Sequence, residues 1–297
     1  MHRNYLIIVH PQTGKRHRLG KIINELDHYF STHKHDHDLY YTRPDLSATE
    51  LVKHHLRDHT DIIAIGGDGT LNEVINGFDN PDLIFSFIPN GSGNDFAKNF
   101  HFQSLEHQVT NALEGPVRTI DLGLCNQRKF INGVGIGLDG QVIYDLLYKK
   151  NILSGSRKYY YHVLRNLLAY KSQQFKFRVD DVERQQKLLL LCVANGTTFG
   201  NGFRLTPQAD LFDGFLDVCE VGDLNVGQRL LHVPKLALGT HHKLKKVELY
   251  KAREVHIDQN DFLHAHIDGE YMGSPPFVIK VLPAALKIRL PKNTIVP

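Results

Sequence analysis

Short apolar runs alternate with segments of helical apolar spacing over the first 120 residues of the chain. The predicted strands are Tyr5–Val9, Leu39–Tyr41, Ile62–Ile65 and Leu83–Ile88. After each strand, apolar residues recur at helical spacing, at 19–30, 51–56, 71–78 and 94–100. Alternating strands and helices predict a parallel sheet with helices on its faces, which is a Rossmann-like α/β domain.

The pattern changes after Asp121, where strand-like runs follow one another. They lie at 129–132, 175–179, 188–194, 215–221, 246–250, 254–257, 277–281 and 286–290. Many short strands separated by turns are typical of an antiparallel β-sandwich. One helical insert is expected at about 138–170. The sequence therefore predicts two domains, an α/β domain at 1–122 and a β-sandwich domain at 123–297.

The composition is that of a soluble globular protein, with 41% hydrophobic and 23% charged residues among 297. No apolar run has the length of a membrane-spanning helix, and we expect no signal peptide. Cys125, Cys192 and Cys219 lie far apart in apolar surroundings, which predicts buried free thiols in a reducing, cytoplasmic compartment. The net charge of +3 is too weak to indicate nucleic-acid binding but is compatible with an anionic membrane surface.

A glycine-rich turn, Gly66-Gly67-Asp68-Gly69-Thr70, joins the third predicted strand to its helix. Such a turn presents backbone N–H groups and a positive helix end to a phosphate. Asp68 suits this site if it acts through Mg²⁺. The alternative is a tight structural turn in which Asp68 caps the helix. Because the polar loops 10–15 and 89–95 also follow strands of this sheet, we expect all three loops to meet at its carboxyl edge.

Four motifs, in order along the chain, carry a family resemblance. The first two are Gly66–Val74, in which Asn72-Glu73 follow the glycine turn, and Pro89–Ala97. The others are the set Asn195-Gly196, Gly202-Phe203, Pro207 and Asp213-Gly214, and then Asp268-Gly269-Glu270. Together they resemble the diacylglycerol kinase catalytic-domain family, and within it the soluble bacterial lipid kinases, which are related to NAD kinases. The resemblance implies an α/β domain followed by a β-sandwich.

The resemblance also implies which residues contact ATP and a catalytic Mg²⁺. The implied ATP contacts are His10, Pro11, Gln12, Thr13, Gly14, Thr42, Gly66, Gly67, Asp68, Gly69, Thr70, Leu71, Asn72 and Ser92. His10 stands where the family usually has Asn, and Ser92 stands where it often has Thr. Asp68 and Asp95 are the implied carboxylates around Mg²⁺ or its waters.

Glu270 is the expected general base, because an alcohol is a poor nucleophile until its proton is accepted. Phosphoryl transfer depends mostly on positioning and charge stabilisation, so this base need not be strong. Taken alone, Asp268-Gly269-Glu270 is more typical of an ordinary hairpin turn. The accompanying motifs favour the catalytic interpretation.

A second, structural Mg²⁺ site is implied by the same resemblance. Its ligands would be the Asp213 side chain and the backbone oxygens of Asp210 and Phe215, and oxygen ligands suit Mg²⁺. The alternative is an Asp-Gly turn that joins two strands.

The helical insert combines basic, aromatic and apolar residues. They are Lys149, Lys150, Arg157, Lys158, Tyr159, Tyr160, Tyr161, Leu164, Leu167 and Leu168. This mixture suits an interfacial helix that meets anionic lipid, and the alternative is a packed helix with a solvated basic face. The expected partners are thus a lipid substrate and a membrane surface, with no nucleic acid and with room for a homodimer.

The sequence favours an ATP- and Mg²⁺-dependent lipid kinase that phosphorylates the hydroxyl of diacylglycerol and yields phosphatidic acid. One alternative is NAD kinase-like phosphorylation of a soluble metabolite, against which Leu71-Asn72-Glu73 and Asn94–Ala97 argue. Another is a non-enzymatic nucleotide- or lipid-binding relative. The presence of Asp68, Asp95 and Glu270 together argues against that relative.

Overall fold

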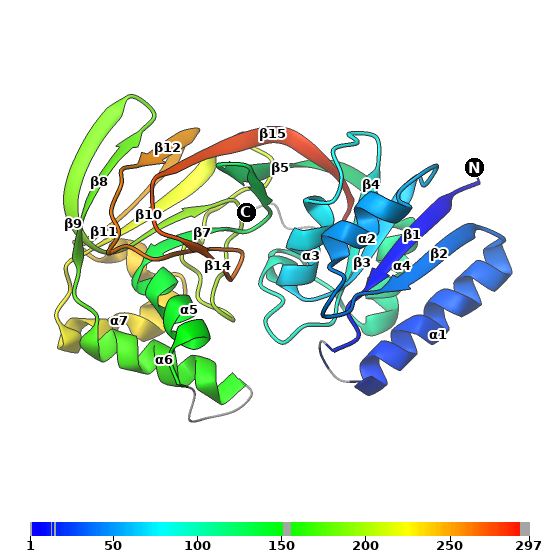
Figure 1. Cartoon of the computed structure of the whole chain (residues 1–297), viewed down its shortest axis with the longest axis horizontal. Helices are drawn as coiled ribbons and strands as arrows, with labels where there is room; N and C mark the ends of the chain where they lie inside the picture. The colour runs from blue at the N-terminus through cyan, green and yellow to red at the C-terminus, as the bar shows by residue number, and fades with distance from the viewer. Residues whose placement is uncertain (1, 13, 15, 151–155, 292–297) are drawn as a thin grey trace. The chain divides into compact units, whose positions relative to one another are not determined.

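The computed structural model describes residues 2–12, 14, 16–150 and 156–291. They form two compact units, one that runs to Leu122 and resumes at Pro283, and one that spans Gly123–Leu282. The first unit holds parallel strands and the second holds an antiparallel sheet (Figure 1). The expected two-domain α/β fold class is confirmed.

In chain order the first unit contains β1 (Asn4–Val9), α1 (Arg16–His33), β2 (Asp36–Tyr41), α2 (Ala48–His55), β3 (Asp61–Gly66), α3 (Asp68–Ile75), β4 (Ile84–Pro89), the 3₁₀ helix η1 (Phe96–Asn99) and α4 (Leu105–Glu114). The four strands are parallel, in the order β4-β3-β1-β2. Tyr5, Ile7 and Val9 alternate along β1 and share a core with α1 and α4. α2 and α3 pack against β1 and β3.

The segment after β4 differs from the predicted helix at 94–100, because only the short η1 forms there. Asn94 has a φ of +51°, and its side chain hydrogen-bonds both the N–H and the C=O of Gly91. A residue in the left-handed region cannot start an α-helix, so the helical turn is delayed until Phe96. The backbone from Asn90 to Asp95 is therefore an irregular loop and not part of a helix.

The second unit begins within β5 (Val117–Cys125) and ends within β15 (Phe277–Arg289). Between them lie β6 (Arg128–Phe130), β7 (Gly133–Gly137), α5 (Leu138–Tyr148), α6 (Ser156–Ala169), β8 (Gln173–Val179), β9 (Val182–Ala194), β10 (Leu216–Gly222), α7 (Val226–Ala237), η2 (His241–Lys243), β11 (Val247–Ala252), β12 (Glu254–Ile257), β13 (Ala265–Ile267) and β14 (Glu270–Gly273). The strands run in the order β14-β13-β7-β9-β8-β12-β15, and β10 joins β9 to β11. The predicted insert is the helix pair α5 and α6.

The carboxyl half of β9 is buried on both faces, which explains why it is continuously apolar. Leu191 and Val193 face the sandwich core. Leu190 and Cys192 face a second core, to which α5, α6 and α7 contribute (Figure 1). The three cysteines are free and buried, as predicted, and burial raises the pKa of the Cys125 and Cys219 thiols to about 12.

The carboxyl end of the chain differs from the predicted division, which assigned 123–297 to the second domain. The predicted strands 277–281 and 286–290 are one strand, β15, and its described residues from Pro283 on belong to the first unit. Ile288 pairs with Phe85 of β4. The Arg289 guanidinium lies 2.5 Å from Asp61 Oδ1, with both side chains buried. This ion pair fastens β15 to the start of β3.

Candidate active site

The loops at the carboxyl ends of the parallel strands are joined by main-chain hydrogen bonds. The N–H of His10 donates to the C=O of Ile65 over 2.9 Å, and that of Thr42 donates to Val9 over 2.9 Å. The N–H of Asn90 donates to Gly66 over 2.7 Å. The predicted nucleotide loops therefore do meet at one edge of the first unit. Thr13, an expected ATP contact, lies outside the described residues.

Glycine is required where these loops approach one another. Gly14 has a φ of +70°, and a methyl group there would lie 2.0 Å from the backbone oxygen of Asn90. A methyl group on Gly91 would lie 2.5 Å from the Cα of Gly67, and one on Gly66 would lie 2.3 Å from Thr70 Oγ1. Gly67 starts α3 without a side-chain cap. The first N–H groups of α3 are thus left for a ligand, which fits a phosphate.

The Asp68 and Asp95 carboxylates both lie near the position that a side chain on Gly93 would occupy. A methyl group on Gly93 would be 3.4 Å from Asp68 Oδ2 and 4.0 Å from Asp95 Oδ2. Asp68 accepts the N–H groups of Asp95 and Phe96, each over 3.0 Å. It therefore caps η1, whereas the sequence alternative had it capping its own helix. Burial raises the pKa of Asp68, and these two hydrogen bonds partly oppose the shift.

The carboxylate pair fits a magnesium ion that keeps most of its water. Among the described residues no cluster of three or more His, Cys, Asp or Glu side chains is present that would hold a metal. Mg²⁺ commonly binds through one or two carboxylates together with waters and substrate phosphates. Asp95 also pairs with Lys98 Nζ at 2.6 Å, so this cation already compensates part of the charge.

The remaining expected ATP contacts differ in accessibility. Pro11, Gln12 and Ser92 are exposed. Thr42, Thr70, Leu71 and Asn72 are buried, and Leu71 packs inside the unit. Their side chains serve the fold, so any contact of Leu71 with nucleotide must use its backbone.

Two cationic side chains, Arg18 and Lys98, lie beside the loop at 89–95, and the motifs indicated neither of them. A hollow of about 340 Å³ is lined by Arg18, Lys98, Asn94 and neighbouring residues. The Arg18 guanidinium donates to the Pro89 C=O over 3.0 Å and to Gln108 Oε1 over 2.6 Å. Arg18 lies in α1, 71 residues before its partner Pro89, so no local pattern shows this contact.

Glu270 in the second unit is the first residue of β14, directly after a tight turn. The turn residues Asp268 and Gly269 have φ values of +46° and +86°, as a two-residue type I′ hairpin requires. The turn is therefore a hairpin, as the alternative interpretation predicts. It leaves the Glu270 side chain about 39% exposed. Its carboxylate pairs with the Arg128 guanidinium from β6.

The predicted structural Mg²⁺ site lies in the loop before β10. Asp213 Oδ1 accepts the Phe215 N–H over 3.0 Å, and its other oxygen pairs with Lys251 Nζ. Gly214 has a φ of +75°, as an Asp-Gly turn favours. Burial, together with Asp213 and Asp210, raises the pKa of Asp217 to about 6, opposed by Lys251. Lys251 stands where the ion would bind, so the site stays a prediction.

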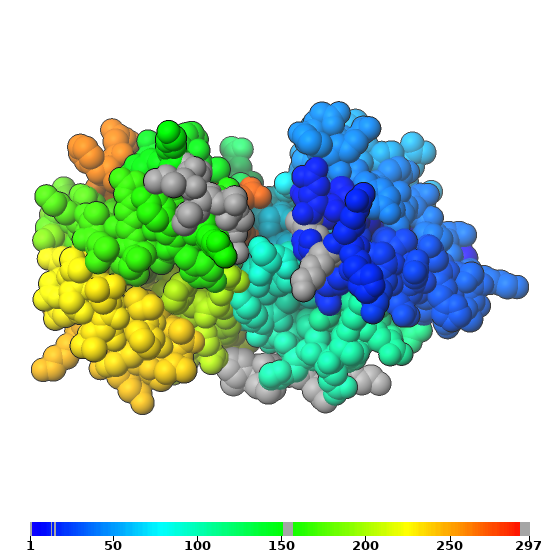
Figure 2. Space-filling view, turned by 90° about the horizontal axis from the view of Figure 1, so that it is seen from below, coloured from blue at the N-terminus to red at the C-terminus, as the bar shows by residue number. Residues whose placement is uncertain are grey.

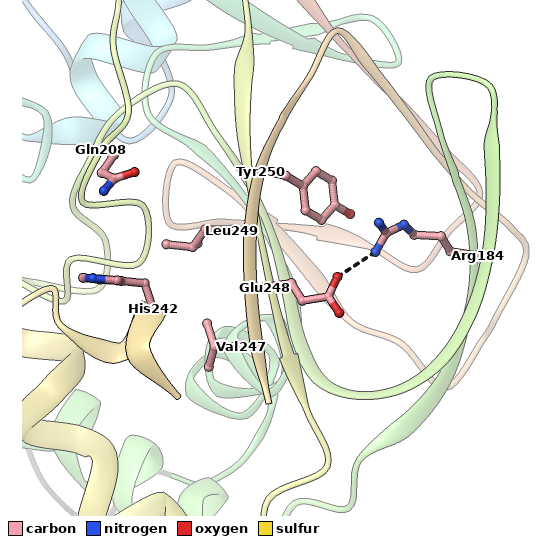
Figure 3. Close-up of a pocket in the computed structure, with 7 residues that line it drawn as sticks. All are labelled: Arg184, Gln208, His242, Val247, Glu248, Leu249 and Tyr250. Atoms are coloured by element: carbon pink, nitrogen blue, oxygen red, sulfur yellow. Dashed lines mark hydrogen bonds and ion pairs between the residues drawn. The ribbon is translucent and has the colours of Figure 1, made fainter. Parts of the chain in front are cut away.

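A wide surface hollow of about 550 Å³ lies beside β11 in the second unit (Figure 3). Arg184 points toward Tyr250 and pairs with Glu248 at 3.0 Å and with Glu220 at 2.7 Å. The charges in this hollow compensate one another, and no residue of the four motifs lines it.

A small apolar cavity of about 60 Å³ lies between the helices and β9 of the same unit. Its lining includes Leu138, Val142, Tyr159, Phe199 and Phe203, and Asp139 is the charged residue among its walls. Such a lining suits a hydrocarbon group.

Two family models match the chain. The diacylglycerol kinase catalytic domain matches residues 4–125, and the YegS C-terminal NAD kinase beta sandwich-like domain matches residues 132–290. A diacylglycerol kinase of Staphylococcus saprophyticus is 31% identical over 287 residues, which cover 93% of this chain and 92% of the relative. A diacylglycerol kinase of Bacillus subtilis is 29% identical over 244 residues, 80% of each chain.

Solved structures show the same fold. The crystal structure of a diacylglycerol kinase from Bacillus anthracis matches with a TM-score of 0.73 at 22% identity, covering 99% of this chain and 98% of that chain. Both units take part in this match, since nearly the whole of each chain is covered.

Proposed function

Because the chain belongs to the diacylglycerol kinase catalytic-domain family and is a lipid kinase, we propose that it transfers the γ-phosphoryl group of ATP to the hydroxyl of diacylglycerol. The product is phosphatidic acid, and the reaction depends on Mg²⁺. The observation that carries this proposal is the glycine edge of the first unit, where Gly66, Gly67 and Gly91 let the loops approach one another closely and Gly67 starts α3 without a side-chain cap.

ATP is held by the first unit in this proposal. The N–H groups at the start of α3 and in the loop at 89–95 bind phosphate oxygens, and Arg18 and Lys98 add positive charge beside that loop. Mg²⁺, when bound, neutralises charge on the phosphates. Asp68 and Asp95 hold its waters, and Lys98 orients the Asp95 carboxylate.

Glu270 accepts the proton of the lipid hydroxyl. As that oxygen bonds to the γ-phosphorus, the bond from phosphorus to the bridging oxygen breaks, and ADP leaves with the electron pair. The proton passes to the Glu270 carboxylate and then to water. Arg128 pairs with Oε2 of this carboxylate, so the other oxygen, Oε1, accepts the proton.

A lipid kinase must reach its substrate in a bilayer, and the helices of the second unit support such a surface. Tyr160, Leu164 and Leu168 of α6 are about half exposed beside the basic residues of the insert. Leu231 of α7 and Leu238, which directly follows that helix, are both 70% exposed. Helices α5 and α6 (green) lie next to α7 (yellow) on one face of this unit (Figure 2). Peripheral membrane association in the cytoplasm, and a homodimer, stay predictions.

No helix in the described part of the chain has both the length and the apolar character needed to span a bilayer. Helix α6 packs in the second core and also exposes tyrosines and leucines, so the packed-helix interpretation agrees with the structure and the interfacial interpretation stays a proposal.

The test is phosphate transfer from labelled ATP to lipids in mixed micelles. The panel contains diacylglycerol, monoacylglycerol and sphingosine, with NAD as a soluble acceptor. We expect labelled phosphatidic acid and a requirement for Mg²⁺. A protein that labels none of the lipids, or that labels NAD preferentially, contradicts the proposal.

A further inference from the structure

A buried histidine–aspartate pair lies directly behind the turn that carries Glu270. His266 Nε2 is 2.9 Å from Asp139 Oδ2, and the side chains are 5% and 18% exposed. Asp139 comes from the first turn of α5, where the helix dipole favours a carboxylate. His266 comes from β13, two residues before Asp268. No motif in the sequence indicated either residue.

The His266–Asp139 pair fits because the neighbouring strand β7 has a glycine beside it. Gly135 of β7 is the register partner of His266, and a methyl group there would lie 2.4 Å from His266 Nε2 and 2.3 Å from Asp139 Oδ2. A methyl group on Gly140 would lie 2.0 Å from the His264 C=O, so α5 is pressed closely against β13. These contacts fix where the imidazole ring can lie.

The other ring nitrogen of His266 reaches the turn. The Gly269 N–H donates to His266 Nδ1 over 3.2 Å. An imidazole nitrogen that accepts carries no proton, so the proton of the neutral ring is on Nε2, which lies beside the Asp139 carboxylate. The chain of contacts thus runs from Asp139 through His266 to the residue that precedes Glu270.

The opposite side of the turn is held independently. The Asp268 carboxylate accepts the N–H groups of Ile131, Asn132 and Gly133 over 2.8 to 3.0 Å. With Asp268 held there, the bond from the Gly269 N–H to His266 Nδ1 holds the peptide between Asp268 and Gly269 from the other side. This peptide sets the direction in which β14, and with it Glu270, leaves the turn.

We propose that Asp139 and His266 are positioning residues for Glu270: Asp139 selects the tautomer of His266 that accepts the Gly269 N–H. The role of Glu270 rests on the proposed function, whereas the contact with Gly269 does not. A displacement of a catalytic group by about 1 Å costs on the order of 10²-fold in rate, so a contact one residue away from the base matters for turnover.

Two substitutions separate the two bonds of the ring. His266→Asn keeps an acceptor near the position of Nδ1 but cannot reach Asp139. His266→Gln reaches Asp139 with its amide but offers no acceptor to Gly269. We expect kcat for diacylglycerol to fall about 10- to 100-fold in His266→Gln and by about threefold or less in His266→Asn, with KM for ATP unchanged in both.

Amide hydrogen exchange at Gly269 in the full chain supplies a readout besides activity. We expect faster exchange in His266→Gln than in the wild type, and near wild-type exchange in His266→Asn. Equal exchange at Gly269 in all three proteins, or equal losses of kcat in both variants, overturns the inference. A wild type that phosphorylates no lipid but shows the expected exchange overturns the proposed function and leaves the contact with Gly269 standing.

The pH profile gives a third readout. A second proton on Nδ1 removes the acceptor of the Gly269 N–H, so turnover falls as the ring becomes charged. Burial lowers the pKa of His266, but Asp139 on α5 and Asp268 in the turn outweigh it and raise the pKa above the ordinary 6.5. On the other neighbours, β14 presents Tyr271 and β7 presents Gly135. We expect an acidic fall in kcat that begins above pH 6.5 and that His266→Asn lacks; an unchanged profile in that variant contradicts the inference.

Discussion

The glycine edge of the first unit and the turn before Glu270 in the second unit are held in place by different kinds of contact. The first is built from backbone, since main-chain hydrogen bonds join its loops and Gly67 and Gly91 touch through their Cα atoms. The second is built from side chains, since Asp268 and His266 hold the turn from opposite sides. A surface that binds phosphate through N–H groups needs glycine, because the backbone must be accessible. A turn that orients one carboxylate needs side chains that hydrogen-bond to it from both sides.

The largest expected effect comes from removing the aimed carboxylate. Glu270→Gln should lower kcat on diacylglycerol about 10²- to 10⁴-fold, because the amide cannot accept the hydroxyl proton. ATP affinity and thermal stability should stay as in the wild type. Steady-state kinetics in mixed micelles measures the change. Glu183→Gln, an exposed carboxylate on β9, is the matched control and should be fully active.

The attachment of β15 to the sheet of the first unit depends on the buried ion pair of Arg289 and Asp61. Arg289→Ala should lower the free energy of unfolding by about 3–5 kcal/mol, because it leaves the Asp61 carboxylate buried without its cation. Lys287, on the same strand as Arg289, makes an exposed pair with Asp82, and Lys287→Ala should leave the free energy of unfolding nearly unchanged. Urea unfolding measures both. Equal costs for the two variants would show that the buried pair does not fasten β15.

A methyl group placed in the glycine edge tests whether backbone contact matters there. Gly91→Ala should weaken ATP binding about 10- to 100-fold, because the new Cβ must push the Gly67 backbone away. Gly20→Ala in α1 has nothing within 4 Å of the new methyl and should leave binding unchanged. Calorimetric titration with ATP measures both variants. Tight binding by Gly91→Ala contradicts a backbone-built site.

The smallest effect is expected at the proposed membrane surface. Leu164→Glu on α6 should weaken binding to anionic vesicles about three- to tenfold, because it places a charge in the apolar face. Val182→Glu, on an equally exposed residue of β9, should bind as the wild type does. Vesicle sedimentation measures both, and equal binding by the two variants removes α6 from the surface.

Features that depend on neighbouring residues could be predicted from the sequence. The strand–turn–helix at Gly66 is visible because an apolar run, glycines and helical spacing follow within a few residues. The start of the helical turn after Pro89 could not be placed, since it depends on the positive φ of Asn94. Helix α7 was missed because Pro234 interrupts its pattern, although Asn225 and Gln228 form a capping box that signals its start.

Features that depend on distant residues could not be predicted. Arg289 joins the first unit through Asp61, a partner 228 residues away, so no local pattern shows where the last strand belongs. The pairing of His266 with Asp139 requires the space left by Gly135, and that space exists only after β7 and β13 pair. The roles of Asp68 and Glu270 come from the family resemblance, and their hydrogen-bonding partners come from the structure.

The central claim is that the glycine edge binds ATP and that Glu270 activates the lipid hydroxyl. The most direct measurement determines the ATP Kd and the turnover on diacylglycerol for Gly91→Ala and Glu270→Gln side by side. We predict that Gly91→Ala loses ATP affinity, and that Glu270→Gln keeps the wild-type Kd within about twofold while losing turnover. A Glu270→Gln variant that turns over like the wild type, or that no longer binds ATP, contradicts this division of roles.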